Sequence, residues 1–107
     1  MKKPACGELS IPVYFIAEIS VTDPETYAVY LRKVRDTVEN HGGRYLARGG
    51  TVVPIGGGWH PERLVVIEFP SFDRMNAWLS SEEYRALAPL REASAQSRAA
   101  AVEGLGS

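Results

Sequence analysis

Two glutamates stand within apolar stretches of the chain, which makes them candidates for proton transfer. Glu18 lies in residues 13–22 and Glu68 lies in residues 63–70, and both stretches read as strands. Because side chains alternate between the two faces of a strand, each glutamate shares a face with large apolar groups. Such surroundings disfavour the charged form of a carboxylate unless a cation or donor pairs with it, so Glu68 is a candidate general base. The alternative is an ordinary buried ion pair with a nearby arginine (Arg44, Arg48 or Arg63) or a solvated contact between subunits.

The stretch from Arg48 to Ser71 is rich in glycine and proline and contains the pair Trp59-His60. Its run of consecutive glycines lacks the lysine and hydroxyl residue of a phosphate-binding loop and precedes a strand instead of a helix, which favours a connecting loop. His60 is the second candidate for proton transfer. Trp59 and Arg63 would suit a small carboxylate or aromatic ligand, whereas the alternative for Trp59 is to cap the core or a subunit contact.

The residues predicted to bind a ligand stand on one face of the expected sheet or at its end. They are Tyr14, Glu18, Tyr45, Arg48, Trp59 and Arg63. No metal site is expected, because the sequence holds neither a helical His-x-x-x-His pair nor a cysteine cluster, and no cofactor is expected either. Cys6 is the only cysteine, and its place near the N-terminus favours an incidental thiol over a nucleophile.

Composition limits the classes of protein that the chain can belong to. It has 107 residues, of which 45% are hydrophobic and 23% are charged, as in one globular domain. We expect a flexible tail over residues 1–11 and a single domain over residues 12–104. Twelve basic residues against thirteen acidic ones argue against nucleic acid as a partner. The sequence shows neither the apolar core of a signal peptide nor an apolar run long enough to cross a membrane, so we expect a cytoplasmic protein without membrane contact.

The first predicted strand is followed by clear signals for a helix. After residues 13–22, Asp23-Pro24-Glu25 supply an N-cap, a proline for the first turn and an acid beside the positive end of the helix dipole. The helix is expected to end near Asn40, because Gly42 can take a left-handed backbone conformation. Its apolar and aromatic residues recur every three or four positions and define the inward face: Tyr27, Tyr30, Leu31, Val34 and Val38.

The remaining elements follow from similar signals. Residues 44–53 predict a second strand bent at Gly49 and Gly50, and residues 63–70 predict a third. Ser71 caps a second helical region, which a serine at position 80 or 81 is expected to break before Pro89 starts another turn. Residues 97–107 are rich in alanine, yet the order of elements favours a closing strand. The residues expected to point inward from the second helical region are Phe72, Met75, Trp78, Leu79, Tyr84, Leu87 and Leu90.

The order β-α-β-β-α-β predicts an α+β protein with the ferredoxin-like fold, in which two helices cover one face of a four-stranded antiparallel sheet. On the other face, Tyr14, Ile16, Leu64 and Val66 stand beside the two glutamates. Helices on one side cannot cover this second apolar face, so we expect it to be buried against a second copy of the chain.

The segments "GGRYLARGG", "GGGWHPERLVVIEFPS", "AWLSSEEYRAL" and "VEG" resemble the small dimeric α/β-barrel proteins of domain-of-unknown-function family 1330. The resemblance runs from about Tyr14 to Gly104 and includes Trp59, Pro61 and Arg63. It implies a ferredoxin-like protomer whose sheet joins that of a partner to form a barrel. Similar barrels include heme-free monooxygenases, muconolactone isomerases and heme enzymes, which is a likeness of fold and not of site.

These observations predict an uncharacterised homodimeric α/β-barrel protein with a small-molecule pocket between the sheet and its partner. One alternative is a cofactor-independent enzyme, similar to a monooxygenase or an isomerase, that acts on a small aromatic or carboxylic substrate. The other is a noncatalytic module for ligand binding or assembly. A ligand bordered by Glu68, Arg63 and Trp59 would favour a pocket, and a cavity filled by side chains would favour assembly.

Overall fold

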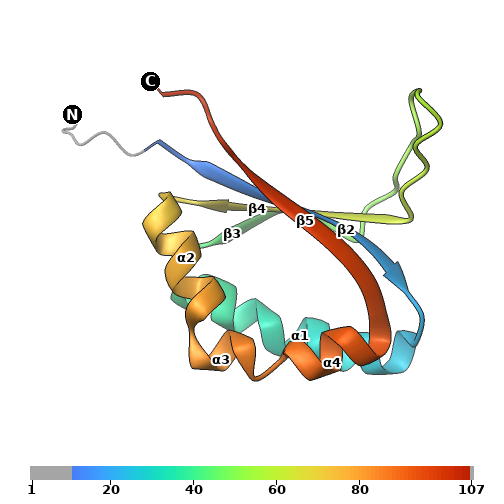
Figure 1. The fold of residues 1–107 in the computed structure, drawn as a ribbon, viewed down its shortest axis with the longest axis horizontal. Coiled ribbons are helices and arrows are strands. Elements are labelled where there is room, and N and C mark those ends of the chain that lie inside the picture. The colour runs from blue at the N-terminus through green and yellow to red at the C-terminus, as the bar shows by residue number, and fades with distance from the viewer. Residues whose placement is uncertain (1–10, 107) are drawn as a thin grey trace.

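The computed structural model describes residues 11–106, and Figure 1 shows its fold. The elements in chain order are β2 (Val13–Val21), α1 (Pro24–Asn40), β3 (Arg44–Arg48), β4 (Arg63–Phe69), α2 (Phe72–Ser80), α3 (Glu82–Arg85), α4 (Ala88–Ser94) and β5 (Ala95–Glu103). The tail expected over residues 1–11 and the incidental thiol expected at Cys6 lie, apart from Ile11, outside the described residues.

The strands form one antiparallel sheet in the order β3-β4-β2-β5. Helices α1 to α4 all lie on the same side of this sheet, and the loop of residues 49–62 extends from its other side (Figure 1). This arrangement confirms the predicted α+β class and the ferredoxin-like order of elements. None of the helices in the described part of the chain is long and apolar enough to cross a membrane.

Helix α1 begins at the residues that the sequence predicts. The Asp23 carboxylate accepts hydrogen bonds from the Thr26 backbone N–H at 3.3 Å and from the Thr26 hydroxyl at 2.8 Å. These hydrogen bonds hold the pKa of the Asp23 carboxyl below its ordinary value. Pro24 occupies the first turn, where its missing N–H costs no hydrogen bond.

The turn after α1 passes close to the core. Gly42 has φ of 81°, the left-handed conformation expected at a helix end. Gly43 is buried, and a Cβ atom there would lie 2.6 Å from Val38 Cγ1 and 2.7 Å from Phe69 Cε1. Glycine is therefore the residue that lets the chain cross between α1 and the sheet.

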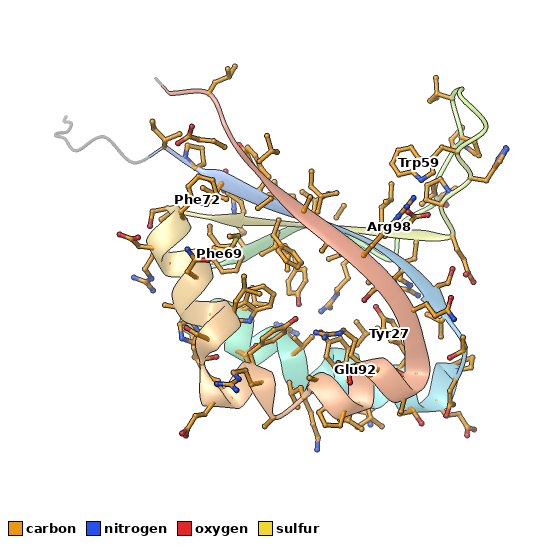
Figure 2. The ribbon with its side chains drawn as sticks, in the orientation of Figure 1. Tyr27, Trp59, Phe69, Phe72, Glu92 and Arg98 are labelled. Atoms are coloured by element: carbon orange, nitrogen blue, oxygen red, sulfur yellow. The ribbon has the colours of Figure 1, made fainter. Side chains whose placement is uncertain are left out.

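Ser71 and Ser81 cap the second helical region as predicted. The Ser71 hydroxyl accepts from the Arg74 N–H at 3.2 Å, and the Ser81 hydroxyl accepts from the Tyr84 N–H at 3.2 Å. The break at Ser81 separates α2 from α3, and Pro89 lies in the first turn of α4. The predicted inward position of Phe72 is wrong, because it is the first residue of α2 and is 41% exposed at the end of the helix (Figure 2).

Two strand predictions need correction. The second strand ends at Arg48, and Thr51–Val53 is not a strand, because Gly49 takes φ of 79° and turns the chain into the long loop. The closing strand starts at Ala95, earlier than expected. It pairs with β2 along its whole length, from Ala95 opposite Val21 to Glu103 opposite Val13, and this ladder overrides the helix propensity of its alanines.

The two faces of the sheet differ as strand alternation predicts. The face toward the helices holds the buried residues Val13, Ala17, Ile19, Val65, Ile67 and Phe69. The opposite face, here called the open face, is made by Tyr14, Ile16, Glu18, Leu64, Val66 and Glu68 with Arg98, Ala100 and Val102. On it Ile16 is 38% exposed and Val102 is 52% exposed. No helix within the described residues covers the open face (Figure 1).

Trp78 organises the core between the sheet and the helices. Its ring lies 5.2 Å from the Phe15 ring, 5.2 Å from the Phe69 ring and 4.2 Å from the Tyr84 ring, measured between centroids. Its indole N–H donates to the Thr37 hydroxyl at 3.0 Å, so the buried polar atom is satisfied. The prediction that Trp78 points inward is confirmed, since only 2% of its surface is exposed.

Candidate functional site

A cavity of about 300 Å³ lies between the helix-facing side of the sheet and the helices. All four strands and all four helices contribute to its walls. The walls are largely apolar, and no Asp, Glu or His is among the described residues that line them. A cavity of this size and lining has room for a small planar molecule. The aromatic residues of the walls are Phe15, Tyr27, Tyr30, Tyr45, Trp78 and Tyr84.

The cavity is lined by a tyrosine, Tyr27, whose buried hydroxyl has no hydrogen-bond partner among the described residues. Tyr27 comes from the first turns of α1 and is only 3% exposed. Burial raises the pKa of Tyr27 above its ordinary value, so the hydroxyl is a donor at neutral pH. A buried donor without a partner costs about 1–3 kcal/mol, and a ligand oxygen would remove that cost.

Two arginines stack on tyrosine rings at this end of the cavity. The Arg63 guanidinium carbon lies 5.3 Å from the centroid of the Tyr27 ring, and that of Arg48 lies 4.6 Å from the centroid of the Tyr45 ring. Both positive charges oppose the effect of burial on the pKa of Tyr27. Tyr45 also has its pKa raised by burial, with Arg48 acting against it. This end of the cavity therefore carries positive charge and phenol donors together.

A second tyrosine–arginine group lies elsewhere in the same cavity and is internally satisfied. Arg91 Nη1 on α4 donates to the Tyr84 hydroxyl on α3 at 2.6 Å. Tyr30 lies nearby, and burial raises its pKa well above the ordinary value. Because Arg91 and Tyr84 already pair with each other, this group is better suited to holding α3 and α4 together than to binding a ligand.

The residues predicted to bind a ligand divide between the two faces of the sheet. Tyr45 and Arg48 line the cavity. Arg63 does not line it but lies over the ring of Tyr27, which does. Tyr14 and Glu18 lie on the open face with Ile16. The structure thus brings Tyr45, Arg48 and Arg63 together on the helix-facing side.

The two glutamates of the open face are paired with arginines. Glu68 Oε1 accepts from Arg44 Nη2 at 2.7 Å, and Arg44 lies directly opposite Glu68 in the sheet. The predicted alternative of an ion pair with Arg44 is confirmed for Glu68, but the pair is not buried, because the Arg44 side chain is 71% exposed. Glu18 Oε1 accepts from Arg98 Nε at 2.7 Å, also across the sheet. Each glutamate side chain is 25% exposed.

Trp59 and His60 lie in the loop between β3 and β4. Trp59 is 50% exposed and borders a shallow depression on the open face beside Ile16 and Glu18. Figure 2 shows Trp59 and Tyr27 on opposite sides of the sheet. His60 is exposed and does not line the cavity.

Sequence reasoning missed the part of the site that comes from the helices. Tyr27 and Tyr30 follow the apolar spacing of α1 and were predicted as part of its inward face, without a role in binding. The available signal was chemical, because a buried tyrosine needs a partner for its hydroxyl. Among residues 11–106, no three His, Cys, Asp or Glu side chains lie close enough together to hold a metal ion. The expectation from the sequence that the protein has no metal site stays a prediction, which metal analysis of the purified protein would test.

The comparison with known families identifies the chain. Residues 12–105 match the family model described as a domain of unknown function, DUF1330. The chain belongs to the DUF1330 family. This confirms the resemblance predicted from the sequence motifs. No sequence match is found among curated proteins.

Solved structures similar to this DUF1330 protein support its fold. A protein of unknown function from Rhodopseudomonas palustris matches with a TM-score of 0.74 and 21% identity over 90% of this chain and 84% of its own. SnoaB, a cofactor-independent oxygenase from Streptomyces nogalater, matches with a TM-score of 0.65 and 11% identity over 87% of this chain and 92% of its own. A dimeric ferredoxin-like protein of unknown function from Bacteroides fragilis matches with a TM-score of 0.55 and 14% identity over 90% of this chain and 99% of its own. Sequence identity this low supports a shared fold alone.

Proposed function

We propose that this DUF1330 protein is a homodimer that binds a small, largely apolar molecule in the helix-side cavity of each protomer. The observation that carries the proposal is the buried hydroxyl of Tyr27, a residue that lines the cavity, because this hydroxyl has no partner among the described residues. Binding sites for small molecules combine apolar walls with few polar groups that fix orientation, and this cavity has that character. The pocket expected between the sheet and the partner lies on the other face and stays a prediction.

The open face supports the homodimer. Its apolar side chains, including Ile16 and Val102, are uncovered within the described residues and would be buried against the same face of a second copy. The loop of residues 49–62 extends beyond this face (Figure 1), and it carries Val53 and Ile55, which are 68% and 94% exposed. These side chains suit a loop that packs on the partner. The dimeric Bacteroides fragilis protein has the same fold and adds support.

The alternative of a cofactor-independent enzyme has support from the fold shared with SnoaB. Proton transfer in the cavity would need a base, and its described lining has neither a carboxylate nor an imidazole. The pKa values of Tyr27, Tyr30 and Tyr45 are raised, so these phenols stay protonated at neutral pH. Binding is therefore the better supported function. Catalytic roles for Glu68 and His60, and a cytoplasmic location, stay predictions.

Filling the cavity tests the proposal. Ala17 is buried on β2 and lines the cavity, so Ala17→Leu would place three further carbons inside it. Fluorine NMR with 4-fluorobenzamide, a neutral planar probe, should show a broadened ligand resonance with the wild-type protein and little broadening with Ala17→Leu. A dissociation constant of about 1 mM is expected for a ligand of this size.

The matched control is Ala77→Leu, which adds the same carbons at an exposed position of α2 outside the cavity. It should bind the probe as the wild type does. Thermal unfolding of each variant checks that the fold is intact. Equal broadening with all three proteins would contradict binding in this cavity. So would the absence of broadening with the wild type both for this probe and for its charged analogue 4-fluorobenzoate.

A further inference from the structure

Arg48 and Arg63 converge at one end of the cavity although they come from different strands. Arg48 lies opposite Val65 in the sheet, and Arg63 is two residues before Val65 on the same strand. Both side chains therefore belong to the helix-facing side as diagonal neighbours. A Cβ atom at Gly49 would lie 3.2 Å from Arg63 Nη1, which brings the Arg63 guanidinium next to the backbone that follows Arg48. The side chains of Arg48 and Arg63 thus leave neighbouring positions of the sheet at the same end of the cavity.

No carboxylate neutralises this pair. Within residues 11–106, neither Arg48 nor Arg63 forms an ion pair, whereas Arg35, Arg44 and Arg98 each pair with a glutamate. Two like charges at close range repel each other, and an anion between them would relieve that repulsion. Arg63 is half-buried, so screening by water at this charge is reduced.

The third group at this end is the Tyr27 hydroxyl. It is a buried donor without a partner among residues 11–106, and the Arg63 guanidinium lies over the Tyr27 ring that carries it. Two planar cations and a phenol donor match the acceptor oxygens of a carboxylate, which arginine binds through paired N–H groups. Arg48 is exposed while it lines the cavity, so the positive end is also the mouth through which a ligand would enter.

We propose that the molecule bound by the cavity is a small carboxylic acid with a planar apolar body. Its carboxylate lies between Arg48, Arg63 and the Tyr27 hydroxyl, and its apolar body extends among the aromatic residues toward Trp78. This inference rests on the proposed function, because it assigns the chemical class of the ligand for the same cavity. The positive mouth also selects against neutral molecules of the same shape.

The test compares two probes of nearly equal shape, 4-fluorobenzoate and 4-fluorobenzamide, which differ in charge. Fluorine NMR titrations should give a dissociation constant for the benzoate about tenfold lower than for the benzamide. Arg48→Gln and Arg63→Gln should each weaken benzoate binding about tenfold, as expected for the loss of a hydrogen bond to a charged group. Benzamide binding should change less than twofold. Tyr27→Phe should weaken benzoate binding as well, because it removes the buried donor.

Arg32→Gln is the matched control, since Arg32 is exposed on α1 and does not line the cavity. It removes the same charge and should leave benzoate binding unchanged. Thermal unfolding verifies that each variant is folded. Equal affinity of the wild type for both probes, or benzoate affinity insensitive to Arg48→Gln and Arg63→Gln, would overturn the carboxylate assignment while leaving cavity binding in place. If the wild type binds neither probe, the proposed function fails with it.

Discussion

Ile16→Lys is expected to convert the proposed homodimer into monomers. Ile16 lies at the middle of β2, between Val66 on β4 and Ala100 on β5, so it stands near the centre of the open face. In a symmetric dimer the substitution would bury two unpaired ammonium groups against the partner sheet. An uncompensated buried charge costs about 3–5 kcal/mol, which corresponds to an increase of at least a hundredfold in the dimer dissociation constant. Sedimentation velocity at micromolar concentration would measure the change.

The isolated protomer should tolerate this substitution, because Ile16 is already 38% exposed without a partner. Ala28→Lys is the control: it adds a lysine at an exposed position of α1, a helix on the opposite side of the sheet from the open face (Figure 1). That variant should sediment with twice the protomer mass of 11.7 kDa, as should the wild type. An Ile16→Lys protein that keeps the dimer mass would place the interface elsewhere.

Trp78→Ala should produce the largest loss of stability of any single substitution considered for this fold. It removes the ring that contacts Phe15, Phe69 and Tyr84, and it leaves the Thr37 hydroxyl without the indole donor. Large-to-small changes of a buried tryptophan cost about 3–5 kcal/mol, a large part of the total stability of a small protein. Urea unfolding followed by circular dichroism would measure the difference in the free energy of unfolding.

Phe72→Ala provides the comparison for Trp78→Ala. Both residues belong to α2 and both changes remove an aromatic ring, but Phe72 is 41% exposed. Its loss should lower the free energy of unfolding by about 1 kcal/mol or less. All proteins are measured at one protein concentration, because the proposed dimer would make stability depend on that concentration. Comparable losses for the two variants would contradict the central place of Trp78 in the core.

The fold was predictable because its signals are local. Asp23 and Ser71 cap helices through their own side chains, and Gly42 ends α1 through its backbone freedom. Alternation in β2 and β4 separated the two faces correctly, since side-chain direction in a strand depends only on position. The closing strand had no such signal. Its alanines favour helix, and only the ladder with β2 determines their conformation.

The site was less predictable because it depends on contacts between distant elements. From its spacing in α1, Tyr27 looks like an ordinary core residue. Only the packed structure shows that its hydroxyl lacks a hydrogen-bond partner among the described residues and that Arg63 of β4 lies over its ring. The length of β3 was misjudged for a related reason. The conformation of Gly49 ends the strand, and a glycine in a strand pattern is compatible with either a bend or a termination. Tyr45 and Arg48 were predicted to bind a ligand between the sheet and a partner, but they line the cavity on the side that faces the helices. Their role in binding stays a prediction.

The placement of the functional site on the helix-facing side of the sheet is tested most directly by a crystal structure of the protein soaked with 4-bromobenzoate. The anomalous signal of bromine locates the ligand independently of the protein atoms. The bromine is predicted to lie inside the helix-side cavity, with the carboxylate within hydrogen-bond distance of the Tyr27 hydroxyl and against Arg48 and Arg63. A bromine on the open face beside Trp59 and Glu18, with the cavity unchanged, would contradict this assignment.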